Sequence, residues 1–178
     1  TKRATADELR TKQTLEELLA RYDLAPFTFT NRVRIDERAT PHSHPVLTLS
    51  TRFMVRSVDG VVADYLHEQL HRYVSSMRAQ SRAANRAWRE MFGKVPRRRG
   101  GGASTRRSTL LHLTVNWLEC EGLCTVLGIE RASDVLDAKV DGPVYPWVYR
   151  QVRDNHEQLA AVLERTGLAA VVNKNSPP

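Results

Sequence analysis

One apolar segment near the middle of the chain constrains the fold most. Residues 108–127 are apolar nearly all round the helical wheel, so a helix formed there has no face suited to water. Other elements must then surround it, and amphipathic helices are predicted over residues 6–22 and 145–166. We expect a mainly helical α+β protein built around a buried central helix that Gly128 closes.

Two segments nearer the N-terminus have the pattern of strands. Residues 27–35 and 46–50 alternate apolar and polar side chains, as half-buried strands do, and residues 36–45 between them form a turn region. These segments predict a small antiparallel sheet immediately before the next helix. Further along, residues 93–105 are predicted to be a loop and residues 134–143 a connection.

The length and composition indicate one globular domain. With 178 residues, 41% of them hydrophobic, the chain can bury a core, and we expect a single domain over residues 1–172 and a disordered tail over 173–178. No apolar run reaches the about 18 residues that a membrane span needs, so no membrane partner is expected.

The two cysteines predict a reducing compartment. Cys120 and Cys124 are four residues apart in a predicted helix, where a disulfide would be strained, so we expect reduced thiols and a cytoplasmic protein. The pair could also bind a soft metal ion, although buried structural thiols are the commoner use of such residues.

The sequence motif H-E-x-x-H supplies the chemistry that this chain suggests most directly. His67 and His71 are four residues apart, so on a helix both imidazoles can bind one Zn²⁺ ion. Glu68 follows the first histidine and can act as general base towards water activated by the metal. Ser57 or Asp59 can cap the helix that carries the motif. The alternative is a solvated amphipathic helix with two ordinary histidines.

A polar stripe on the predicted central helix offers the third metal ligand. His112, Asn116 and Glu119 are spaced i, i+4, i+7, and a carboxylate in so apolar a helix is costly unless it is paired or meets a metal. His112 and Glu119 are about 10 Å apart along the helix axis, so one ion cannot take both. We favour His112 as ligand, with Glu119 accepting the other N–H of a ligand imidazole. The reverse assignment stays open, as does a hydrogen-bonded core role for His112.

Other residues compete for roles in the site. His42 and His44 alternate as strand neighbours and could bind metal, but flanking prolines favour an exposed turn. Tyr145 and Tyr149 are one helical turn apart and could stabilise a developing oxyanion, a role that we assign to Tyr149. Aromatic packing against the core is the alternative for both tyrosines.

Positive charge is concentrated in one segment. The net charge is +7, and residues 97–107 together with Lys94 hold much of the excess around three glycines. Such a loop could bind a nucleic acid or an acidic protein. The segment lacks interleaved aromatic residues for base stacking, so a solvated loop is the favoured interpretation.

In two of these motifs the chain resembles the zincin metallopeptidases, in particular a small bacterial zincin-like type. The matching segments are residues 66–71 (Leu-His-Glu-Gln-Leu-His) and residues 112–119 (His-Leu-x-Val-x-x-Leu-Glu). The resemblance implies a zincin-like fold whose sheet edge aligns an extended peptide or protein substrate beside the metal. The chain departs from better-known branches in having no third ligand soon after His71 in the H-x-x-G-x-x-H manner.

The function implied is that of a zinc-dependent hydrolase, a metallopeptidase that uses zinc-activated water with Glu68 as general base. Two alternatives belong to other classes. One is a non-catalytic zincin-like module with a metal-binding or regulatory role. The other is a basic protein that binds nucleic acid or acidic proteins.

Overall fold

Residues 1–51 and 57–173 are described by the structure, a computed structural model, and contacts divide the chain into two units, residues 1–73 and 74–178. The prediction of a single domain over residues 1–172 stays a prediction. Residues 174–178 of the predicted tail lie outside the described part. Within the described residues, no helix is both long enough and apolar enough to cross a membrane.

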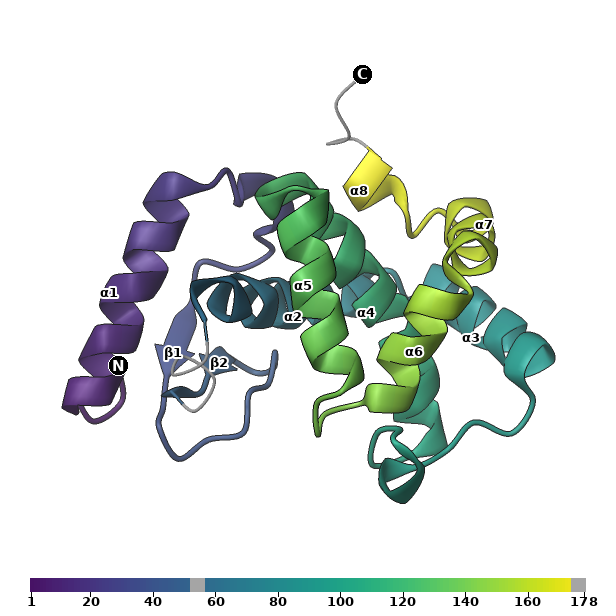
Figure 1. Cartoon of the computed structure of the whole chain (residues 1–178), viewed down its shortest axis with the longest axis horizontal. Helices are drawn as coiled ribbons and strands as arrows, with labels where there is room; N and C mark the ends of the chain where they lie inside the picture. The colour runs from purple at the N-terminus through teal and green to yellow at the C-terminus, as the bar shows by residue number, and fades with distance from the viewer. Residues whose placement is uncertain (52–56, 174–178) are drawn as a thin grey trace. The chain divides into compact units, whose positions relative to one another are not determined.

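The first unit combines two helices with a small sheet (Figure 1). Its elements are α1 (Ala6–Arg21), the 3-10 helix η1 (Ala25–Phe27), β1 (Val33–Ile35), β2 (Leu47–Leu49) and α2 (Val58–Ser76), whose last turn enters the second unit. As predicted, Ser57 caps α2, because its hydroxyl oxygen accepts a hydrogen bond from the N–H of Gly60 at 3.0 Å.

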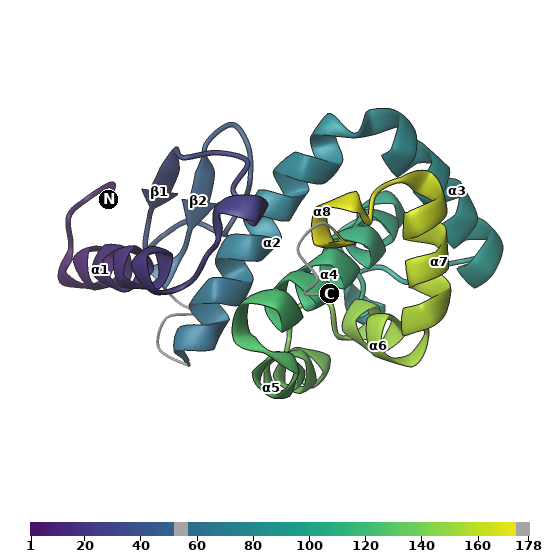
Figure 2. The same cartoon turned by 90° about the horizontal axis from the view of Figure 1, so that it is seen from above.

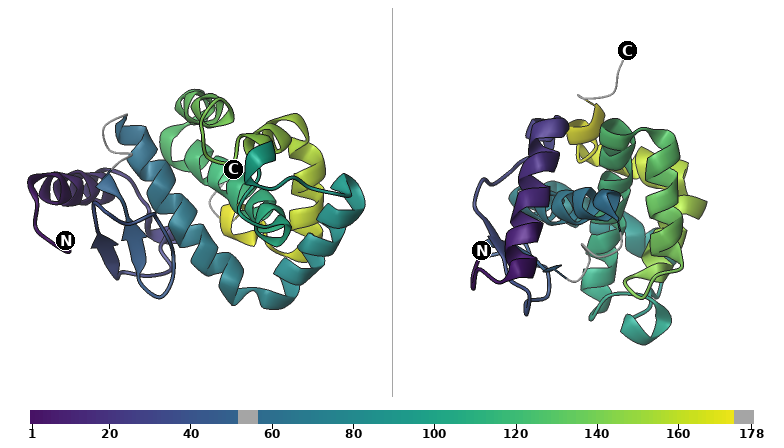
Figure 3. Two further views of the ribbon diagram at one scale, coloured as in Figure 1. Left: turned by 90° about the horizontal axis from the view of Figure 1, so that it is seen from below. Right: turned by 60° about the vertical axis from the view of Figure 1, so that its left-hand side comes forward.

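The sheet is parallel, and the prediction of an antiparallel sheet was wrong. Val33 pairs with Leu47 and Ile35 with Leu49, and Figures 2 and 3 show the two strands side by side next to α1. The chain reverses twice between the strands: it first runs back so that His42 pairs antiparallel with Thr48, and then turns again into β2. An alternating pattern records which side chains share a face, but it carries no information about the direction of pairing.

The first predicted strand is also shorter than expected, for a reason visible in its hydrogen bonds. Only Val33–Ile35 of the predicted segment 27–35 is a strand. The backbone groups of Phe29 and Thr30 pair with the side chain of Gln69 instead of with another strand. Backbone groups that already form hydrogen bonds to a side chain do not need a neighbouring strand as partner.

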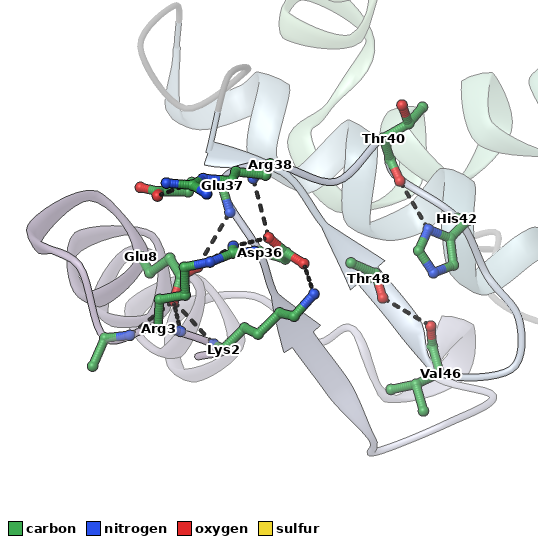
Figure 4. Close-up of polar contacts among 11 residues, drawn as sticks. Lys2, Arg3, Glu8, Asp36, Glu37, Arg38, Thr40, His42, Val46 and Thr48 are labelled. Atoms are coloured by element: carbon green, nitrogen blue, oxygen red, sulfur yellow. Dashed lines mark hydrogen bonds and ion pairs between the residues drawn. The ribbon is translucent and has the colours of Figure 1, made fainter.

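The buried carboxylate of Glu8 holds residues 2–4 against the rest of the first unit (Figure 4). Glu8 is fully buried, and its carboxylate accepts hydrogen bonds from the backbone N–H groups of Lys2, Arg3, Ala4 and Glu37 at 2.6–3.2 Å. Burial raises the pKa of Glu8, but these N–H groups together outweigh that effect and leave the pKa below its usual value.

Asp36 is the second anchor of the same segment. Its two oxygens lie 2.8 Å from Lys2 Nζ and 2.5 Å from an Arg3 guanidinium nitrogen. The hydrogen bond from Lys2, opposed by burial and supported by Arg3, holds the pKa of Asp36 well below its usual range. Residues 2–3 are therefore joined by charge to the turn that follows β1.

The second unit is helical, and the predicted central helix is confirmed. Its elements are α3 (Arg78–Phe92), the 3-10 helix η3 (Arg98–Gly100), α4 (Arg106–Leu127), α5 (Ile129–Val140), α6 (Pro146–Asp154), α7 (His156–Thr166) and α8 (Ala170–Asn173). α4 contacts α3, α5, α6, α7 and α8, and side chains on all its faces are buried. Figure 1 shows α5 beside α6, and Figure 2 shows α3 beside α7.

Two predictions for the second unit were wrong. The supposed connection 134–143 is mostly the helix α5, which buries Ala132, Val135 and Val140 against its neighbours. The supposed single helix 145–166 is two helices that meet at Asn155. There the backbone leaves the helical conformation, and the Trp117 indole donates a hydrogen bond to the His156 carbonyl at 3.1 Å. This tertiary contact, which the local pattern does not encode, accompanies the break.

Candidate metal centre

α2 presents the two motif histidines one above the other. Its apolar face buries Val62, Leu66 and Leu70 completely, and His67 and His71 lie half-buried at the margin of that face. Their Nε2 atoms are 3.1 Å apart, and the ring centroids are 4.8 Å apart with the rings at 74°. One ring donates its Nε2–H to the Nε2 of the other. The two Nε2 atoms therefore lie close enough to share one partner.

This separation fits a shared metal ion. Two nitrogens on a tetrahedral Zn²⁺, each about 2.0–2.1 Å from the ion, lie about 3.3 Å apart. The observed 3.1 Å between the Nε2 atoms of His67 and His71 differs from that by less than a side-chain adjustment. A bound cation would take the place of the shared proton.

Two of the residues between the motif histidines, Glu68 and Gln69, are polar and buried. Glu68 is 6% exposed, and Gln69 is completely buried. The Gln69 amide oxygen accepts hydrogen bonds from the N–H groups of Phe29 and Thr30 at 2.8 and 3.0 Å, and its NH₂ group donates to the Thr30 carbonyl at 2.8 Å. Sequence reasoning missed Gln69, because the motif places no requirement on that position.

In the second unit, α4 buries His112 with a defined hydrogen-bond partner for one ring nitrogen. The side chain is 5% exposed, and Nδ1 donates a hydrogen bond to the Ser108 carbonyl at 2.7 Å. A carbonyl can only accept, so Nδ1 carries a proton, and the neutral form of this ring has its lone pair on Nε2. The ring lies against Tyr145, with centroids 4.1 Å apart. This hydrogen bond is compatible with both roles that the sequence left open for His112, a hydrogen-bonded core histidine and a metal ligand.

Glu119 and Tyr149 belong to one buried cluster with a residue that the sequence did not suggest. The Tyr149 hydroxyl donates to Glu119 Oε2 at 2.9 Å, and Lys139 Nζ lies 2.8 Å from Oε1 and 3.2 Å from the tyrosine oxygen. Burial, together with the Glu119 charge, raises the pKa of Tyr149 well above its usual value. Lys139 was missed because it was placed in a connection rather than on a helix.

The competing histidines are on the surface. His42 and His44 are both exposed, and their Nδ1 atoms bond to the Thr40 carbonyl and the Ser43 hydroxyl, each at 2.8 Å. Figure 4 shows His42 turned towards Thr40. The exposed turn that the flanking prolines favour is the arrangement observed.

The basic segment has more structure than a solvated loop requires. Its cationic side chains line a hollow together with Trp147 of α6, which supplies an aromatic ring that the local sequence lacks; they are Lys94, Arg97, Arg98, Arg99 and Arg106. The Gly101 carbonyl accepts a hydrogen bond from the Trp147 N–H at 3.0 Å. At Gly102 an added Cβ would lie 2.4 Å from the Pro96 carbonyl oxygen, so only glycine fits.

Comparisons with protein-family models, curated proteins and solved structures find no match for this chain. The resemblance to zincins accordingly rests on residues 66–71 and 112–119 alone.

Proposed function

We propose that the protein is a zinc-dependent hydrolase acting on peptide bonds, with His67 and His71 as metal ligands and Glu68 as general base. The observation that carries the proposal is the 3.1 Å separation of the two Nε2 atoms beside a buried Glu68. A solvated helix with ordinary histidines would gain nothing from converging nitrogens and a carboxylate withdrawn from water.

The third ligand stays a prediction, and the contacts inside the second unit favour His112 over Glu119. With Nδ1–H bonded to Ser108, the neutral ring of His112 has its lone pair on Nε2, the form in which imidazole binds metal. Both Glu119 oxygens already have a donor within 2.9 Å, from Lys139 and Tyr149. Using Glu119 as a ligand would require its carboxylate to give up one or both of these partners.

Each residue has a distinct task in the proposed reaction. Zinc, when bound, would polarise the scissile carbonyl and lower the pKa of water to about 7. Glu68 takes the proton from the attacking water and delivers it to the leaving amine. Tyr149 was predicted to stabilise the oxyanion, but its hydroxyl proton is directed at Glu119. We therefore assign that task to Tyr145, whose ring contacts His112.

Replacement of the general base tests the proposal. We expect Glu68→Gln to keep the fold and bound zinc but to lose peptide hydrolysis by about 10²- to 10⁴-fold, because the amide cannot accept the proton. Hydrolysis of a peptide library, read by mass spectrometry, measures this loss, and elemental analysis measures zinc.

The chain contains its own matched control. Residues 156–159 repeat the sequence His-Glu-Gln-Leu on α7, where Glu157 is exposed and no second histidine follows. Glu157→Gln is the same chemical change in the same local sequence and should leave hydrolysis unchanged. Wild-type rates in Glu68→Gln would contradict the assigned base, and equal losses in both variants would indicate an effect unrelated to catalysis.

A further inference from the structure

A second group of metal-ligating side chains lies on the surface of the second unit, away from the residues assigned above. Cys120 and Glu121 on α4 and His156 at the start of α7 each place a ligand atom within 4.8 Å of the other two. Cys124 lies one helical turn after Cys120 on α4. The group thus offers two sulfurs, one imidazole and one carboxylate.

The histidine of this group is held in place from two sides. Its Nε2 lies 2.8 Å from Glu121 Oε1, and its imidazole stacks on the Trp117 indole with centroids 5.4 Å apart at 29°. The Trp117 Nε1–H also donates to the His156 backbone carbonyl at 3.1 Å. Asn155 ends α6 directly before it, so the break between the two helices is what brings His156 back onto α4.

A purely structural role does not account for these cysteines. Thiols that only fill space are buried in apolar surroundings, whereas Cys120 and Cys124 are both half-exposed beside a carboxylate and an imidazole. A disulfide between residues on one helical face would be strained. Two thiols at i, i+4 can instead share one ion, just as paired histidines do.

We propose that Cys120, Cys124, His156 and Glu121 form a binding site for a thiophilic divalent cation such as Zn²⁺. Ligand atoms around a tetrahedral zinc lie about 3.3–3.8 Å apart, so those of Cys120, Glu121 and His156, which lie within 4.8 Å of one another, need to close by only about 1 Å. Cys124 would complete the set from the next turn of α4. The ion displaces the thiol protons and opens the contact between His156 and Glu121. With four protein ligands the site is closed, which is the arrangement of structural zinc, and it would join α4 to the first turn of α7.

Cobalt provides a probe that separates this site from the histidine pair on α2. Co²⁺ bound to thiolate shows a near-ultraviolet charge-transfer band, which ligation by imidazole alone does not produce. We expect the band when Co²⁺ is added to the reduced full chain, its loss when Cys120→Ser and Cys124→Ser are combined, and at least about tenfold weaker Co²⁺ binding in His156→Gln. His67→Gln and Glu157→Gln are the controls and should both retain the band.

Protection of the thiols by zinc is a second test of the site. It uses the wild-type chain, so its result does not depend on whether a variant folds. Added Zn²⁺ should slow alkylation of both Cys120 and Cys124, read peptide by peptide in the mass spectrometer. No thiolate band in the wild type, or no protection of either thiol, would overturn the proposal. A band of unchanged affinity in folded His156→Gln would overturn the ligand set, and a band lost in His67→Gln would assign the signal elsewhere.

Discussion

At the residue scale, the sequence predicted that His67 and His71 lie together on α2 but not the contacts that support them. The H-E-x-x-H spacing was enough to place His67 and His71 on one face, because helical geometry alone determines that relation. It could not show that Gln69, between them, holds the segment before β1 through three hydrogen bonds. Nor could it show Lys139 beside Glu119, because the contact depends on how α4 and α5 pack.

Loss of the Gln69 amide should therefore destabilise the fold. In Gln69→Leu, the N–H groups of Phe29 and Thr30 and the Thr30 carbonyl lose their partners while the side chain stays apolar and similar in size. We expect the free energy of unfolding to fall by about 2 kcal/mol, because three hydrogen bonds to part-buried backbone groups are lost and each contributes about 0.5–1.5 kcal/mol net. Denaturant titration measures it. Gln13→Leu, on the exposed side of α1, should change it by less than about 0.5 kcal/mol; equal effects would contradict the anchoring role.

At the element scale, helices were predicted where a long apolar stripe exists, and errors arose where tertiary contacts decide. α1, α2 and α4 match their periodic patterns closely. The direction of the β1–β2 pairing and the break at Asn155 depend on residues distant in sequence, so local patterns could not supply them. Likewise, the backbone contacts that bury Glu8 at the start of α1 involve Glu37, which lies beyond β1.

The Glu8 carboxylate predicts how the stability depends on acid. Its pKa is lower in the folded than in the unfolded chain, so its stabilisation is fully present above the unfolded pKa of about 4 and is lost as the pH falls through the folded pKa. We expect Glu8→Gln to be less stable than wild type at neutral pH and to lose less stability between about pH 5 and pH 2. Thermal unfolding across that range measures both, with Glu16→Gln on the exposed face of α1 as control. A variant with the wild-type acid dependence would contradict the account.

At the scale of the whole molecule, the chemistry is divided between the two units. The first carries His67, Glu68 and His71, and the second carries His112 and the cysteine-containing site. The proposals therefore predict two kinds of bound metal, one held by imidazoles and one held partly by thiolates, which differ in ligand softness. The basic hollow around Trp147 is a separate feature of the second unit, and neither proposal requires it.

Zinc content of the purified protein tests the central claim most directly. Combining Cys120→Ser with Cys124→Ser removes both thiolates, so zinc that remains in this double variant reports on the imidazole site alone. The account predicts about one equivalent of zinc in the double variant, lost when His67→Ala or His112→Ala is added and retained when Glu119→Gln is added. Zinc absent from the double variant, or still bound after His67→Ala is added, would contradict it.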